Sequence, residues 1–274
     1  MKHPILQAYL ERLANAAGTN SSLWRAPDGV TQGRFFKATL TSAFQPIRSF
    51  DGGKLLGFDA LVRSGPDGAA GLSPFKLLDG AASEEESIHL DRLCRTLHAI
   101  NFFRQADEQS GELYLRVHDR LLAAVDSNHG YAFLRILQAL ELPIHRIVLA
   151  LPATSPTQAW LLNYVADNYR RNGFRLAVQA ASIAGAADAV ERIRPAAIKL
   201  DASIVSDPLA LRDLILACRS NAARLIVKRV ESLATLDQLA LAAEGAETSV
   251  AVQGFAIGAA NAELLGAAPL PAAA

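Results

Sequence analysis

The sequence predicts an α/β protein whose mostly parallel sheet has enough strands to close into a barrel, preceded by an N-terminal helix. Two observations favour this class. Five or six short apolar runs alternate with longer helical stretches, and parallel strands need such crossover connections. The chain has 274 residues, of which 51% are hydrophobic and 20% charged, so it can bury one large core. Disorder as the main state is therefore excluded.

The N-terminal region predicts a helix and a connector. Apolar residues recur at spacings of three and four over residues 4–17, at Leu6, Tyr9, Leu10 and Leu13. We expect this apolar stripe to pack on the main domain or on a second copy of the chain, which would be a homodimer. Residues 18–34 are rich in Ser, Asn, Pro and Gly, so we predict a connector with Trp24 as a packing anchor.

The first strands form a hairpin, and strands then alternate with helices. The runs AFQPIRSF and KLLGFDALVR flank Asp51, Gly52 and Gly53, a strand–turn–strand signal. Further strands are expected within residues 111–117, 145–151, 174–180, 195–201, 223–230 and 250–255. Helices are expected over residues 73–78, 83–103, 132–140, 157–171, 208–219 and 233–243.

Charge and composition limit the partners. Lys plus Arg equals Asp plus Glu at 27 each, so no basic field favours a nucleic-acid polymer. No segment reaches the ~18 apolar residues of a membrane span, and Glu11 and Arg12 interrupt the N-terminal stretch. We therefore expect a cytoplasmic protein without membrane contact. Cys94 and Cys218 fall in apolar helical patterns and are interpreted as core thiols in a reducing compartment.

Histidines do not predict a metal site. His98, His118 and His145 lie in separate elements, with no partner four residues away and no cysteine ligand nearby. We expect them to be surface or helix-end residues.

The ends of the predicted strands carry the functional signal, because chemistry in closed parallel barrels sits at the C-terminal ends of the strands. Six motifs lie there in order: FQPI at 44–47, DALVR at 59–63, LSPFKLL at 72–78, AIKLD at 197–201, VES at 230–232 and QGF at 253–255. Together they resemble the EAL domain, the cyclic-di-GMP phosphodiesterase family. The resemblance implies a TIM-like (βα)8 barrel with one irregular or antiparallel strand. It divides the chain into a helix and connector (1–34), a degenerate EAL domain (35–268) and a tail (269–274).

The resemblance also implies a two-metal site that hydrolyses one phosphodiester bond, but most ligand positions differ here. Asp59 stands where the family has the glutamate of its EAL tripeptide, and Lys199 and Asp201 keep the family's KxD pair. The other ligand positions are Arg116, Ala150, Gln179, Ala180 and Lys228. The segment AAEGAET at 242–248 spells a family motif, but it follows a helical pattern, so Lys228 keeps that position.

Charge then favours an inactive site. Over these positions the family pattern sums to about minus five, which two divalent cations compensate. In this chain Asp59 and Asp201 oppose Arg116, Lys199 and Lys228, a sum of about plus one. Divalent metal would be repelled, so we expect no metal, no cofactor and no catalytic residue.

Several residues are candidates for nucleotide binding instead: Gln45, Asp59, Arg63, Arg116, Lys199, Asp201, Lys228, Glu231 and Gln253. Alternatives stay open for each cation. Arg63 contacts phosphate or pairs with Asp59 or Asp201, and Lys199 contacts the ligand or forms a structural pair with Asp201. Arg116 and Lys228 either replace two metals with fixed cations or point to solvent.

The leading hypothesis is a non-catalytic signalling or regulatory protein that binds a protein partner, with or without cyclic-di-GMP as the switch. A metal-independent cyclic-di-GMP receptor is the first alternative, and a residual phosphodiesterase is the second. Partner binding predicts an exposed apolar helix face and a closed pocket. A receptor predicts an open pocket where Gln45, Arg63 and Lys199 converge.

Overall fold

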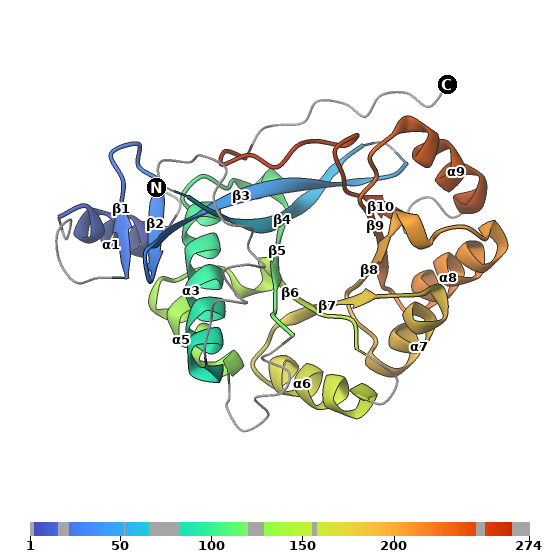
Figure 1. Cartoon of the computed structure of the whole chain (residues 1–274), viewed down its shortest axis with the longest axis horizontal. Helices are drawn as coiled ribbons and strands as arrows, with labels where there is room; N and C mark the ends of the chain where they lie inside the picture. The colour runs from blue at the N-terminus through green and yellow to red at the C-terminus, as the bar shows by residue number, and fades with distance from the viewer. Residues whose placement is uncertain are drawn as a thin grey trace.

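A closed barrel forms the centre of the molecule (Figure 1). The computed structural model describes residues 3–15, 22–51, 53–65, 83–119, 129–154, 158–244 and 250–264. Within them, eight strands follow the order β3-β10-β9-β8-β7-β6-β5-β4, and pairing of β3 with β4 closes the ring. These strands are β3 (Ala38–Ser49), β4 (Leu55–Ser64), β5 (Glu112–Arg116), β6 (Ile147–Leu151), β7 (Arg175–Ala180), β8 (Ala197–Asp201), β9 (Arg224–Lys228) and β10 (Val250–Val252). The predicted barrel is confirmed.

One strand of the ring runs against the others. Strand β3 is antiparallel to both of its neighbours in the ring, β4 and β10, whereas every other neighbouring pair in the ring is parallel. The expected single irregular strand is therefore β3. It enters the ring through the predicted hairpin with β4, which Figure 1 shows in blue and cyan across the top of the ring.

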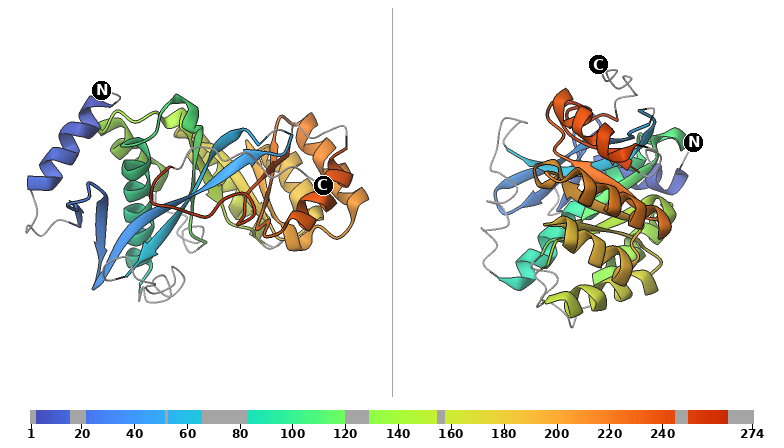
Figure 2. Two further views of the ribbon diagram at one scale, coloured as in Figure 1. Left: turned by 90° about the horizontal axis from the view of Figure 1, so that it is seen from above. Right: turned by 90° about the vertical axis from the view of Figure 1, so that its right-hand side faces the viewer.

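Helices surround the ring (Figures 1 and 2). They are α3 (Glu84–Phe103), α5 (His129–Ala139), α6 (Ala159–Arg171), α7 (Ile183–Ile193), α8 (Pro208–Ser220) and α9 (Leu233–Ala243), with short 3-10 turns at Glu108–Ser110, Ile144–Arg146 and Ala202–Ile204. Helix α3 begins where expected, because the Ser83 side chain accepts a hydrogen bond from the Glu86 backbone N–H. Helix α7 was not expected from the sequence; Ser182 caps it in the same way.

The N-terminal segment is more ordered than a connector. It contains β1 (Leu23–Arg25) and β2 (Thr31–Phe35), which extend the sheet beyond the barrel by antiparallel pairing of β1 with β2 and of β2 with β3. The prediction of a connector was wrong at these residues. Helix α1 (Pro4–Asn15) packs beside β1 at one end of the molecule, as Figure 2 shows.

The apolar stripe of α1 is covered by its own chain. Leu6, Leu10 and Leu13 are at most 6% exposed and belong to the main hydrophobic core. Of the two expected supports for this stripe, the main domain is the observed one. The LSPFKLL motif and the helix expected at 73–78 lie outside the described residues. The tail (269–274) and residues 245–248 of the AAEGAET segment also lie outside them.

The barrel interior is filled in layers, because alternate residues of each strand point inward. The middle layer is apolar and consists of Ile47, Tyr114, Val148, Ala150, Ala177, Ala197, Ile226 and Ala251. Toward the N-terminal ends of the strands, Arg175 and Arg224 both form ion pairs with Glu112, and the Tyr114 hydroxyl donates to the same carboxylate. Ion pairs thus occupy the N-terminal end of the barrel interior, below the apolar layer.

Some polar residues are more buried than the sequence suggested. His98 on α3 is only 5% exposed, and its Nδ1 lies 2.7 Å from the Ser42 hydroxyl. The prediction that it is a surface or helix-end residue was therefore wrong. Burial lowers the pKa of His98 to about 4, so its imidazole is neutral at pH 7. Both cysteines are free thiols; Cys218 is buried and Cys94 is half-buried.

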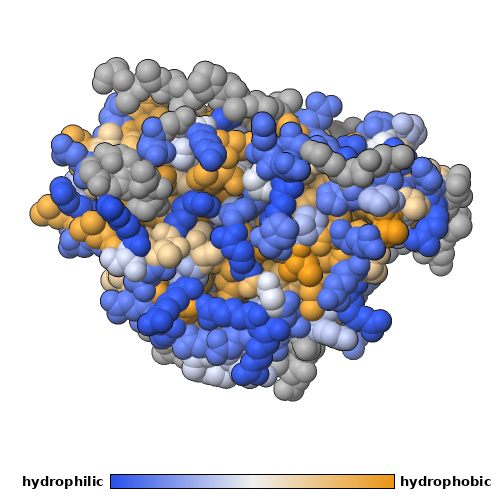
Figure 3. All heavy atoms as spheres, turned by 180° about the vertical axis from the view of Figure 1, so that it is seen from behind, coloured by the Kyte–Doolittle hydropathy of each residue, from blue (hydrophilic) through white to orange (hydrophobic). Residues whose placement is uncertain are grey.

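Apolar residues on the surface are scattered among hydrophilic ones, as on the face shown in Figure 3. The most exposed large ones are Leu209, Leu241 and Phe255, each at least 71% exposed. Among the described helices, none combines the length and the apolar character that crossing a membrane requires.

Candidate functional site

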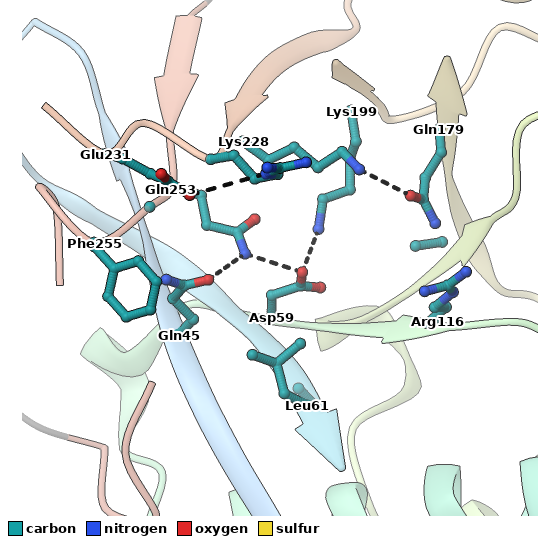
Figure 4. A pocket seen from close by; sticks show the side chains of 14 residues that line it. Gln45, Asp59, Leu61, Arg116, Gln179, Lys199, Lys228, Glu231, Gln253 and Phe255 are labelled. Carbon is teal, nitrogen blue, oxygen red and sulfur yellow. Dashed lines mark hydrogen bonds and ion pairs between the residues drawn. The ribbon is translucent and has the colours of Figure 1, made fainter. Parts of the chain in front are cut away.

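A cavity of about 250 Å³ opens at the C-terminal ends of the barrel strands (Figure 4). Its polar and mouth residues are Gln45, Asp59, Arg116, Gln179, Lys199, Lys228, Arg229, Glu231, Gln253 and Phe255. They come from β3, β4, β5, β7, β8 and β9 and from the segments that follow β9 and β10. Residues far apart in the sequence thus lie close together at the C-terminal ends of the parallel strands. Seven of the nine candidates from the sequence line this cavity.

A buried ion pair lies at its centre. The Lys199 ammonium is 2.8 Å from Oδ2 of Asp59, and the two side chains are 3% and 16% exposed. The same ammonium lies 5.3 Å from the centroid of the Tyr114 ring. The predicted structural pair of Lys199 with Asp201 is therefore not observed; Asp59 is the partner.

Two glutamines extend this centre into a network. The Gln253 amide donates to Oε1 of Gln45 at 2.9 Å and to Oδ2 of Asp59 at 3.1 Å. The side-chain oxygen Oε1 of Gln253 is buried and has no hydrogen-bond partner among the described residues. Gly254 allows the end of β10 to lie close to the segment that follows β9, since a Cβ at this position would lie 2.1 Å from the Val230 carbonyl oxygen. The QGF motif thus serves to place an amide in the cavity.

Two further cations flank the network. The Lys228 ammonium donates to Oε1 of Gln179 at 3.3 Å, and Arg116 lines the wall on the same side as Gln179 (Figure 4). Burial lowers the pKa of Lys228; Lys199 and Arg116 lower it further, while Asp201 and Asp59 oppose the shift. Arg116, Lys199 and Lys228 thus line one cavity; of the three residues that a receptor was expected to bring together, Gln45 and Lys199 line it and Arg63 does not.

Arg63 and Asp201 are not part of the cavity wall. Arg63 is exposed and donates to the carbonyl oxygen of Val62. Asp201 caps the 3-10 turn at Ala202–Ile204 through Ser203 and lies 3.3 Å from the Arg229 guanidinium. Burial raises the pKa of Asp201, but the Ser203 hydrogen bonds and the charges of Arg229 and Lys228 together lower it by more. The net shift of this pKa is downward.

Two residues at the mouth of the cavity, Arg229 and Phe255, were not among the binding candidates. Arg229 has a left-handed backbone (φ 60°), and its guanidinium lies between Asp201 and Glu231, 3.9 Å from the latter. Phe255 is 71% exposed on the same side of the cavity as Glu231 (Figure 4). Their neighbours Lys228 and Gln253 were recognised, but no pattern showed that the next side chains also reach the mouth.

The donor set of the cavity does not fit divalent metal ions. Among the described residues, its lining carries four cations (Arg116, Lys199, Lys228, Arg229) and two carboxylates (Asp59, Glu231), a formal charge of plus two. Both carboxylates already pair with cations of the same cavity. Within the described ranges, no group of three or more His, Cys, Asp or Glu residues could hold a metal ion. Hard cations need several free oxygen ligands, which this cavity does not offer.

Comparison with known protein families identifies the domain. The EAL domain family matches residues 32–260, most of the chain. The chain belongs to the EAL domain family. Its barrel and the strand-end motifs on it are those of an EAL domain. No curated protein sequence matches the chain.

Solved EAL domains share the fold. The Bacillus subtilis YkuI protein, solved with cyclic-di-GMP and calcium, superposes with a TM-score of 0.65 at 22% identity, over 83% of this chain and 56% of YkuI. Klebsiella pneumoniae BlrP1, solved with cyclic-di-GMP and manganese, gives a TM-score of 0.65 at 17% identity, over 86% of this chain and 57% of BlrP1. The chain thus spans little more than half of either protein. The FimX EAL domain of Pseudomonas aeruginosa, bound to cyclic-di-GMP, gives 0.64 at 20% identity, over 95% of this chain and 96% of that domain.

Proposed function

We propose that this EAL domain binds cyclic-di-GMP in the barrel cavity without metal and without hydrolysing it, and acts as a regulatory receptor. The main support for this proposal is the positive charge of the cavity. In the part of the chain that the structure describes, four cations and two carboxylates line it, a sum of plus two. A cyclic dinucleotide carries one negative charge on each of its two phosphodiester groups, so the ligand and the cavity have complementary charge.

The positions of the cations support phosphate binding. Arg116 and Lys228 both line the cavity, and the guanidinium and the ammonium can each donate hydrogen bonds to a phosphate there. Lys199 contributes charge from below, although its ammonium already binds Asp59. A volume of about 250 Å³ is smaller than the ~300–1,000 Å³ typical of ligand pockets. The cavity therefore suits the phosphate-bearing part of the ligand, with the rest lying along the mouth.

Absence of hydrolysis follows from the same residues. Phosphodiester hydrolysis by a two-metal site needs cations that polarise the phosphate and generate the attacking hydroxide. In this cavity Arg116, Lys199 and Lys228 occupy the region with fixed positive charge, and Asp59 is neutralised by Lys199. A fixed ammonium or guanidinium attracts phosphate but does not activate water.

Equilibrium binding of cyclic-di-GMP to two variants tests the proposal. Replacing both Arg116 and Lys228 with Ala removes two charge-assisted contacts, and each is worth about 1.5–3 kcal/mol, or ~10- to 100-fold in affinity. The matched control is Arg212→Ala, an exposed arginine on α8 outside the cavity lining, which should bind as the wild type does. Unchanged affinity in the double variant, or no binding by the wild type, would contradict the proposal.

Protein-partner binding is the second candidate, and helix α6 provides the observation that favours it. Trp160 and Tyr164 lie one helical turn apart and are 65% and 49% exposed. Exposed aromatic residues of this kind are typical anchors of protein interfaces. A receptor that signals through such a surface would combine both hypotheses. Loss of partner capture in Trp160→Ala, with cyclic-di-GMP binding intact, would support it, and unchanged capture would exclude this surface.

A further inference from the structure

Arg229 has a conformation that its side chain disfavours. Its φ is 60°, in the left-handed region, where the Cβ of any residue other than glycine comes too close to its own backbone. The residue directly follows the last residue of β9, Lys228, and lines the cavity. Strained backbone of this kind is retained where the surrounding structure gains something from the side chain.

The contacts of Arg229 place its charge across the mouth. One nitrogen of the guanidinium lies 3.3 Å from Asp201 and another 3.9 Å from Glu231. The side chain is still 66% exposed, so most of its hydrogen-bond donors face solvent. Two carboxylates therefore orient the guanidinium, while part of it stays exposed to solvent. Lys228 and Arg116 supply further positive charge in the same cavity.

We infer that Arg229 is a phosphate-binding residue at the mouth of the cavity, and that its left-handed backbone is a stability cost accepted for that contact. The inference rests on the proposed binding of cyclic-di-GMP and adds a residue and a role to it. Arginine suits this place because its planar fork can bond two phosphate oxygens while Asp201 and Glu231 hold it in position. A glycine would relieve the backbone but would remove the contact.

The test compares glycine at two left-handed arginines. Arg194, at the C-cap of α7, has φ 50° and an exposed side chain, and it precedes β8, so it lies at the opposite end of the barrel from the cavity. Arg194→Gly should raise Tm by about 2–4 °C, since it relieves a left-handed residue. Arg229→Gly gives the same relief but also removes the ion pairs with Asp201 and Glu231, so its Tm should rise by less. Only Arg229→Gly should weaken cyclic-di-GMP binding, by about tenfold or more.

Two further variants separate charge from shape. Arg229→Lys keeps the charge but loses the planar fork, so it should bind more weakly than the wild type and more tightly than Arg229→Gln. Arg229→Gln removes the charge and should bind as weakly as Arg229→Gly. Wild-type affinity in Arg229→Gly would overturn the assignment while leaving the proposed function intact. A lower Tm in Arg229→Gly, with a higher Tm in Arg194→Gly, would overturn the stability cost. Absence of any binding by the wild type would overturn the proposed function itself.

Discussion

The buried pair of Asp59 and Lys199 makes a sharp prediction about stability. Replacing Asp59 with Ala leaves the Lys199 ammonium 3% exposed without its carboxylate. Removing one partner of a buried ion pair is worth about 3–5 kcal/mol, because the remaining charge is desolvated and uncompensated. At about 2–4 °C of Tm per kcal/mol for a protein near this size, Tm should fall on the order of 10 °C.

The reverse variant should be milder. In Lys199→Met, Asp59 keeps the hydrogen bond from Gln253 at 3.1 Å and is 16% exposed, so we expect a loss of about 1–3 kcal/mol. In the double variant neither charge is buried, and the double-mutant cycle should give a coupling free energy of about 1–3 kcal/mol.

Urea unfolding followed by circular dichroism measures each free energy. The control is Asp188→Ala, which breaks an exposed pair with Arg192 and should lose at most about 1 kcal/mol. If Asp59→Ala loses no more than this control, Lys199 is not held by Asp59, and the description of the cavity centre is wrong.

Three further outcomes are expected. Incubation with cyclic-di-GMP and Mg²⁺ or Mn²⁺ should give no linear dinucleotide above a no-enzyme control, as measured by chromatography. The reason is that the family's metal-ligand positions are occupied by Arg116, Ala150, Gln179, Ala180 and Lys228. Metal-dependent product would contradict this expectation. The affinity for cyclic-di-GMP should fall as salt rises, because arginine and lysine supply the phosphate contacts; an affinity indifferent to salt would argue against ionic recognition. The free energy of unfolding should fall by roughly 3 kcal/mol as pH drops from 6.5 toward 4, because the pKa of His98 is about 4 in the folded protein and the unfolded chain binds the proton first. In His98→Gln the free energy of unfolding should depend less steeply on pH. An equal slope in this variant would refute the assignment.

The barrel could be predicted because its signals are local. The strands β5 to β9 are continuous apolar runs between helical patterns, and their order fixes which strand ends meet. Arg116, Lys199 and Lys228 each occupy an inward-facing position near or at a strand end, so a closed barrel must bring them together. Strand β2 (TQGRF) escaped prediction because it is mostly polar and contains Gly33, and β1 (LWR) because its three residues lie in a stretch rich in Ser, Asn, Pro and Gly.

The positions of single charged side chains could not be predicted in the same way. Arg63 lies on β4, but β4 pairs with β5 only over Gly57–Asp59 and then continues along β3. At ~3.3 Å per residue, Arg63 lies about 13 Å beyond Asp59 along the strand, away from the cavity. Lys199 pairs with Asp59 rather than Asp201, because Asp201 caps its own turn and pairs with Arg229. A left-handed arginine such as Arg229 leaves no sequence signal.

Titration calorimetry with cyclic-di-GMP, in parallel with and without Mg²⁺, measures whether the cavity binds the dinucleotide without metal. We expect binding with the same affinity in both titrations, because fixed cations of the cavity rather than metal ions contact the phosphates. Binding that requires Mg²⁺, or that tightens more than a few-fold when it is added, would contradict a metal-independent receptor.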